Sequence, residues 1–126
     1  MKWSLSPLYR ACATTALVVG VHAAPVSAAA PSRVLVEATE FRFALSRTTV
    51  KAGPAIVQLA IRGEDPHDLR LAPPRGHASG QPAAVPETLP GDVAEWRGKL
   101  SKGRWTLYCS LPGHKAAGMR ATLTVR

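Results

Sequence analysis

Residues 104–125 read RWTLYCSLPGHKAAGMRATLTV, and this stretch says more about the fold than any other part of the chain. Trp105, Leu107 and Cys109 alternate with polar residues, which is the two-residue period of a half-buried strand. Residues 121–125 alternate in the same way. The residues between these segments include Pro112-Gly113, a turn signal. We therefore predict a strand at 104–109, a loop, and a second strand at 121–125.

Further short segments with the same period precede this stretch. They lie at residues 32–38, 41–45, 55–62, 67–71 and 93–97. Turn signals such as Lys51-Ala52-Gly53-Pro54 separate them, and no convincing amphipathic helix pattern follows the N-terminal region. Short alternating strands separated by Gly and Pro predict an all-β sandwich.

Residues 73–91 differ from the rest because they are rich in proline and glycine. Proline lacks the amide donor of a regular strand ladder. A long segment of this kind in a small domain is usually a functional or disordered loop. We predict a surface loop here, without a regular strand.

The N-terminal region has the layout of a secretory signal peptide. Lys2 and Arg10 are followed by the uncharged stretch 11–21 and by the small residues Val26-Ser27-Ala28. We predict cleavage after Ala28, which gives a signal peptide at 1–28 and a mature domain at 29–126 in the periplasm or otherwise exported. The uncharged stretch is shorter than the roughly 20 residues that span a bilayer, so we expect no stable membrane insertion after cleavage.

Charge and cysteine content restrict the function. The formal net charge is +8, which favours acidic partners, anionic membrane surfaces or nucleic acid. Nucleic acid is set aside because the basic residues are scattered and export removes the usual target. After cleavage Cys109 is the single remaining cysteine. A lone cysteine in an exported protein is a metal ligand, a free thiol or half of an intermolecular bridge.

The loop from Cys109 to Met119 carries three metal-ligand types: a thiolate, the imidazole of His114 and a thioether. Two His and one Cys with a weak axial Met form the blue-copper electron-transfer site. The second imidazole has to come from another strand end, and His67 is the best candidate. His77 lies in the Pro-rich segment, and His22 leaves with the signal peptide.

Other readings remain open. Zinc accepts Cys and His, although Met119 favours copper. A Cys–His hydrolase would need a base and an oxyanion hole, which no motif marks. A multicopper oxidase or nitrite reductase would need more histidines than the 4 present. Storage, delivery or buffering of copper without electron transfer would use the same ligands. We expect an electron carrier and not an enzyme.

The chain resembles the cupredoxins of the plastocyanin/azurin type. The residues that carry the resemblance are the segment Pro66-His67-Asp68-Leu69 and the run from Gly103 to Val125 with the spacing Cys-x4-His-x4-Met. The resemblance implies a Greek-key β-sandwich, one type 1 copper and electron shuttling between redox partners. The chain departs from the family at Asp68, where Asn is usual, and in residues 73–91.

Two expectations follow for the surroundings of copper. Asp68 either ties the two ligand segments together by a hydrogen bond near Cys109 or is a solvated turn residue. His114 should reach the surface of a monomer, as the docking point for redox partner proteins. The residues expected around it are apolar or small: Leu111, Pro112, Ala116, Ala117 and Gly118. The cations Lys99, Lys102, Lys115 and Arg120 either steer an acidic partner or provide ordinary solubility.

Overall fold

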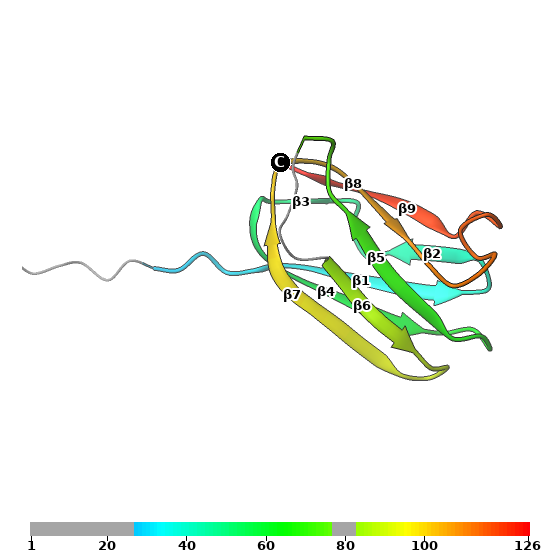
Figure 1. Ribbon diagram of the computed structural model, residues 1–126. Helices are drawn as coiled ribbons and strands as arrows, with labels where there is room; N and C mark the ends of the chain where they lie inside the picture. The colour runs from blue at the N-terminus through cyan, green and yellow to red at the C-terminus, as the bar shows by residue number, and fades with distance from the viewer. Residues whose placement is uncertain (1–26, 77–82) are drawn as a thin grey trace, which may run out of the picture.

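A computed structural model describes residues 27–76 and 83–126, and the alternating segments of that part form nine strands (Figure 1). The strands are β1 (Ser32–Thr39), β2 (Arg42–Leu45), β3 (Thr49–Val50), β4 (Gly53–Ile61), β5 (His67–Ala72), β6 (Ala83–Thr88), β7 (Val93–Leu100), β8 (Gly103–Tyr108) and β9 (Arg120–Val125). No helix forms in these residues, so none of sufficient length and apolar character to cross a membrane is found in them.

The strands form two sheets. One has the order β2-β1-β4-β7 and the other the order β3-β9-β8-β5-β6. The β1–β4 and β3–β9 pairs are parallel and the remaining pairs are antiparallel. The chain changes sheet five times along these strands: between β2 and β3, β3 and β4, β4 and β5, β6 and β7, and β7 and β8. The predicted all-β sandwich is confirmed.

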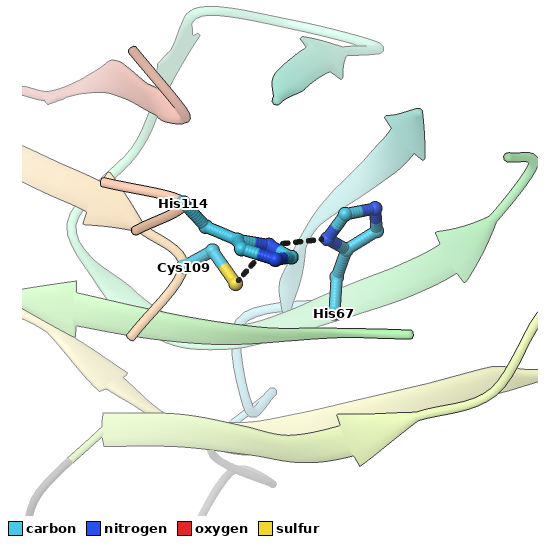
Figure 2. Close-up of side chains that lie close together, drawn as sticks. All are labelled: His67, Cys109 and His114. Carbon is cyan, nitrogen blue, oxygen red and sulfur yellow. Dashed lines mark hydrogen bonds between the residues drawn. The ribbon is translucent and has the colours of Figure 1, made fainter. Parts of the chain in front are cut away.

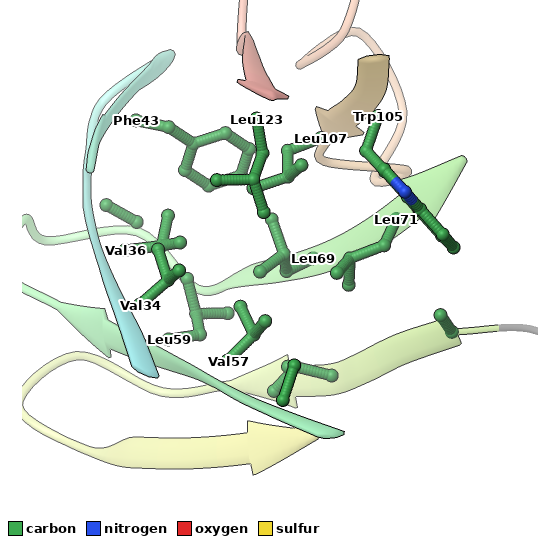
Figure 3. Close-up of a cluster of buried hydrophobic side chains, with 14 of the residues drawn as sticks. Val34, Val36, Phe43, Val57, Leu59, Leu69, Leu71, Trp105, Leu107 and Leu123 are labelled. Atoms are coloured by element: carbon green, nitrogen blue, oxygen red, sulfur yellow. The ribbon is translucent and has the colours of Figure 1, made fainter. Parts of the chain in front are cut away.

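The core lies between the inner faces of the two sheets, and the period of two decides which side chains enter it. Figure 3 shows Val34 and Val57 from one sheet facing Leu71 and Leu107 from the other. Trp105 is 2% exposed, and its indole N–H donates to the carbonyl of Ser101 at 2.9 Å. The largest aromatic side chain is thereby buried without an unpaired polar atom.

The prediction for residues 73–91 is wrong, because β6 lies within them and pairs with β5. Proline is tolerated for two reasons. β6 is an edge strand, and the β5–β6 register shifts between His67 and Leu69, opposite exposed Pro86. A missing amide is harmless at an edge or a bulge. Residues 77–82, which include His77, lie outside the described residues.

Two smaller differences concern the first hairpin and the turn after it. Phe41 is not a strand residue but part of the β1–β2 turn, with φ of 54° and 43% exposure. The short strand β3 was not predicted, and the expected turn at 51–54 is shorter because β4 already begins at Gly53. Gly53 has φ of 118°, a conformation that favours glycine.

The connections at one end of the sandwich come together. In Figure 1 the β1–β2 turn, the β4–β5 connection, the β6–β7 turn and the β8–β9 loop all lie at the end away from the C-terminus. Their proximity also follows from hydrogen bonds: Gly63 N–H donates to Ala38 O, and Gly91 N–H to Ile61 O. His67, Cys109 and His114 lie at this end.

Candidate metal centre

Cys109 directly follows β8 and continues its inward face. Trp105, Leu107 and Cys109 are all buried, as the alternation predicted, and Cys109 is 0% exposed. Its N–H donates to the carbonyl of Met119 at 3.2 Å, which closes the loop between β8 and β9. The thiol is therefore held at the edge of the core by a strand on each side.

A series of tight turns brings His114 back toward Cys109. His114 N–H donates to Leu111 O at 3.2 Å, and Met119 N–H donates to His114 O at 3.1 Å. Gly113 and Gly118 have φ of 82° and 101°, which other residues adopt only with strain. Met119 is 0% exposed, so its thioether is inside the protein at the base of this loop.

His67 is the first residue of β5 and comes from the other side of the site. Its side chain is 0% exposed, although histidine is usually only partly buried. Its Nδ1 lies 3.1 Å from Nδ1 of His114. The structure thus brings His67 to the loop.

The donor atoms of three side chains lie close together, with His114 between Cys109 and His67 in Figure 2. The ligand atoms of His67, Cys109 and His114 all lie within 4.8 Å of one another. Sγ of Cys109 is 3.6 Å from Nδ1 of His114. Residues that are far apart in sequence therefore form a compact cluster of one thiol and two imidazoles.

These distances fit a shared metal ion. Zn²⁺, which is close to copper in size, bonds imidazole nitrogen at about 2.0 Å and thiolate sulfur at about 2.3 Å. Angles of about 100–120° at the metal place two such nitrogens about 3.1–3.5 Å apart and sulfur and nitrogen about 3.3–3.7 Å apart. The 3.1 Å and 3.6 Å separations of this cluster match both values.

The ring of His67 provides a second indication. Its Nδ1 faces the cluster, whereas its Nε2 is buried and has no hydrogen-bond partner among the described residues. A buried polar atom without a partner is costly and calls for an explanation. The ring thus points its Nδ1 toward the other two donors, although this leaves Nε2 without a partner. That orientation would let the Nδ1 lone pair bind a metal held by the cluster.

In the metal-free protein the buried groups are held in their neutral forms. Burial lowers the pKa of His67, and the neighbouring His114 lowers it further. Burial raises the pKa of the Cys109 thiol, and the carboxylate of Asp68 adds to this while two main-chain hydrogen bonds oppose it. A metal that binds here meets a neutral imidazole and has to displace the thiol proton.

Asp68 ties the two ligand segments together, which confirms the first of the two readings given for it. Its side chain is buried, and its Oδ1 accepts a hydrogen bond from Ser110 N–H at 2.6 Å. Ser110 Oγ–H donates to Oδ2, and Arg70 Nε–H donates to the same oxygen at 3.0 Å. Burial is the largest single influence and raises the pKa of Asp68, but hydrogen bonds, chiefly from Ser110 and also from Arg70, together outweigh it, so the pKa is lowered.

The β1–β2 turn reaches both histidine segments, and the sequence contained no signal for this. The ring of Phe41 stands edge-on to His114, with centroids 5.2 Å apart and an 81° angle between the planes. Glu40 Oε1 accepts a hydrogen bond at 2.6 Å from the amide of Glu64, in the connection that leads to His67. Gly63 has no Cβ to clash with the Glu40 carboxylate, which a Cβ would approach to 2.1 Å.

No family model and no curated protein match this sequence. Solved structures match its fold. An auracyanin from Roseiflexus castenholzii aligns with a TM-score of 0.62 and 15% identity, covering 78% of this chain and 99% of that one. Auracyanin A of Chloroflexus aurantiacus, described as a "blue" copper protein, gives 0.61 and 16%, covering 77% and 100%. An azurin from Methylomonas sp. strain J gives 0.58 and 20%, covering 77% and 99%.

The chain has the cupredoxin fold. The fold class implied by the resemblance, a Greek-key β-sandwich of the cupredoxin type, is confirmed. The three-donor cluster lies where the sequence predicted it, between the loop after β8 and the start of β5. At these levels of identity the comparison concerns the fold, so metal and role are argued separately.

Proposed function

We propose that this chain is an exported mononuclear blue-copper protein that carries single electrons. The convergence of His67, Cys109 and His114 within 4.8 Å, inside a cupredoxin fold, is the observation that supports this most strongly. Copper, when bound, would supply a one-electron couple between its two oxidation states. His67, Cys109 and His114 would hold it, and the thioether of Met119 would be a weak fourth ligand.

Met119 is the reason to prefer copper to zinc. A thioether is a soft donor that suits copper and is not a usual zinc ligand. Met119 is fully buried, and its main chain bonds to both Cys109 and His114. A methionine in that position would be available to a metal held by these two residues.

The scaffold would keep the ligands in place during electron transfer. Cys109 and His67 adjoin strands and are 0% exposed, and Asp68 ties their segments together. Locked side chains with hydrogen-bonded neighbours keep a site close to one geometry. Little rearrangement between oxidation states is what a fast electron carrier needs.

Partners would dock at the end where His114 reaches the surface. His114 is the one member of the cluster that is only partly buried. Among the described residues the exposed large apolar side chains are Phe41 in the β1–β2 turn, Leu89 directly after β6 and Val93 at the start of β7, all at this end of the sandwich. Exposed apolar side chains at this end, of which Phe41 contacts His114, suit the weak, brief contacts of redox proteins.

Of the four cations that could attract an acidic partner, only two lie near His114. Lys115 adjoins His114, with its Nζ 4.1 Å from the centre of the Tyr108 ring, and Arg120 donates to Lys115 O at 3.1 Å. Lys99 pairs with Pro54 and Lys102 precedes Gly103, which pairs with Val125. Lys99 and Lys102 therefore lie at the opposite end, so an acidic partner would be met by Lys115 and Arg120.

Export remains part of the proposal, because residues 1–26 lie outside the described residues. It is supported by the signal-peptide pattern of residues 1–28 and by Cys109 as the single cysteine of the domain 29–126. N-terminal sequencing of the exported protein tests it: we expect a start near Ala29. A Met1 start in the exported fraction would indicate a retained anchor.

A copper storage or delivery protein could use the same residues. Burial argues against delivery, because a copper recipient would have to reach ligands of which two, His67 and Cys109, are 0% exposed. An absorption spectrum after copper loading tests the site, since thiolate-to-copper charge transfer gives an intense visible band. Reversible voltammetry and fast electron self-exchange would support a carrier, whereas tight copper binding without reversible electron transfer would support copper handling.

A further inference from the structure

Beside the cluster, Asp68 and Arg70 form an ion pair that the proposed ligands do not require. Asp68 and Arg70 lie two residues apart on β5, so they share the outer face of its sheet. Their side chains differ in exposure, 3% for Asp68 and 44% for Arg70. Arg70 Nε lies 3.0 Å from Asp68 Oδ2 and 3.2 Å from Ser110 Oγ.

The buried member of this pair is close to the sulfur. The Asp68 carboxylate bonds to the main chain and side chain of Ser110, the residue that directly follows Cys109, and its negative charge contributes to the raised pKa of the Cys109 thiol. A charge so close to the site and so well shielded from water acts strongly on any change of charge there.

We propose that the Asp68–Arg70 pair sets the reduction potential of the copper site, with the two charges acting in opposite directions. This inference rests on the proposed one-electron function. The Asp68 carboxylate stabilises the more positive, oxidised ion and lowers the potential. The Arg70 guanidinium opposes this and raises it, but less, because it is partly exposed and screened by water and salt.

A purely structural role for Asp68 predicts something different. If the carboxylate served only to hold Ser110, Asp68→Asn would keep an acceptor for the Ser110 amide and leave the potential nearly unchanged. If both variants merely loosened the loop, the two potentials would shift in the same direction. Shifts of the reduction potential in opposite directions would therefore show that the two charges act on the copper site.

The test compares four copper-loaded proteins by voltammetry at one pH and one ionic strength: wild type, Asp68→Asn, Arg70→Gln and the double variant. We expect a higher potential for Asp68→Asn, a smaller downward shift for Arg70→Gln and an intermediate value for the double variant. Arg97→Gln and Glu95→Gln are matched controls. Their residues form an ion pair of 2.6 Å with the same spacing, on β7 of the other sheet, and should leave the potential unchanged.

A measurement on the metal-free protein checks that the Asp68→Asn variant keeps the native loop. Hydrogen exchange of the Ser110 amide in metal-free Asp68→Asn should stay slow, which shows that the loop is retained. Equal potentials, or shifts of one sign, would overturn the inference while leaving the blue-copper proposal intact. A wild-type protein without a visible band and a reversible couple would overturn the proposed function, and this inference with it.

Discussion

The ring of Phe41 stands edge-on to the imidazole of His114, with centroids 5.2 Å apart. His114 belongs to a surface loop, so this contact supports it from a second, unrelated turn. Phe41 adopts φ of 54°, the only positive φ of a non-glycine residue in the described ranges. Such a backbone costs about 1–2 kcal/mol and persists where the surroundings require it. The turn between β1 and β2 is thus strained where it touches the loop.

We predict that Phe41→Gly is more stable than Phe41→Ala, by about 1 kcal/mol in the free energy of unfolding. Both variants lose the ring, but only glycine adopts this φ without strain. Chemical denaturation of the two metal-free proteins measures the difference. At an ordinary φ the order would be reversed, because glycine loses more chain entropy on folding, so a more stable alanine variant would contradict the strained turn.

We predict that His67→Ala sharply weakens copper binding, whereas His77→Ala does not. His67 faces the other two donors, with 3.1 Å between its Nδ1 and that of His114. With His67 removed, one imidazole and one thiol remain in the cluster. Competition titration with a copper chelator measures the affinities. A strong loss in His77→Ala would assign the second imidazole to the Pro-rich segment instead.

The sequence was sufficient to predict the features that depend on local pattern. Alternating residues placed most of the strands, and Cys109 fell on the same buried face as Trp105 and Leu107. Because the chain has few Cys and His residues, few side chains could be metal donors, and His67 lies beside the loop of Cys109 and His114 as expected. The positions of these residues could be predicted because the two-residue period of a strand is a local property, whereas their role as metal ligands stays a prediction.

Features that depend on distant neighbours could not be predicted. β6 is a strand despite Pro86 because it lies at a sheet edge and its register with β5 shifts at this point. Neither property can be predicted from the residues of β6 alone. Phe41 continued an alternating pattern but belongs to the β1–β2 turn, where its ring contacts His114 from a distant part of the chain. Lys99 and Lys102 lie far from His114 because β8 runs the length of the sandwich between them.

We predict that Glu40 makes the stability of the metal-free protein depend on acid pH. The hydrogen bond from the Glu64 amide is the main cause that lowers the pKa of Glu40 below 4.5. The ionised form therefore stabilises the fold above that pH, and the contribution is lost as the pH falls through the lowered pKa. Below about pH 4.5 the free energy of unfolding should fall more steeply in the wild type than in Glu40→Gln.

Urea denaturation across this pH range provides the measurement. Glu87→Gln is a suitable control, since Glu87 is exposed on β6 and its side chain makes no hydrogen bond to the described residues. It should follow the wild-type curve. Parallel curves for wild type and Glu40→Gln would show that the bond to Glu64 does not hold the connection before His67.

We predict that Cys109→Ser abolishes the intense visible band of the copper-loaded protein. The band requires a thiolate, and serine offers a harder oxygen in nearly the same volume. Cys109 is 0% exposed, so the buried hydroxyl should reduce stability by about 1–3 kcal/mol without preventing folding. Circular dichroism checks the fold, and absorption spectroscopy checks the site. A band that survives in a folded variant would remove Cys109 from the ligand set.

We predict that Met119 adjusts the site more than it holds it. An axial thioether is long and weak, and it acts mainly on the reduction potential. Met119→Leu should therefore keep copper and colour and raise the potential, because losing a donor destabilises the oxidised ion more. Met119→Gln should lower the potential, because a harder oxygen donor favours the oxidised state.

The alternative for Met119 is plain packing in the core, since the side chain is 0% exposed. In that case leucine, which conserves the volume, should cost less than about 1.5 kcal/mol, and glutamine should cost more because it buries an amide. Both substitutions would then change stability but leave the potential in place. Voltammetry of the three proteins at one pH and salt concentration separates the two roles, because only a ligand gives potentials in the order leucine, methionine, glutamine from high to low.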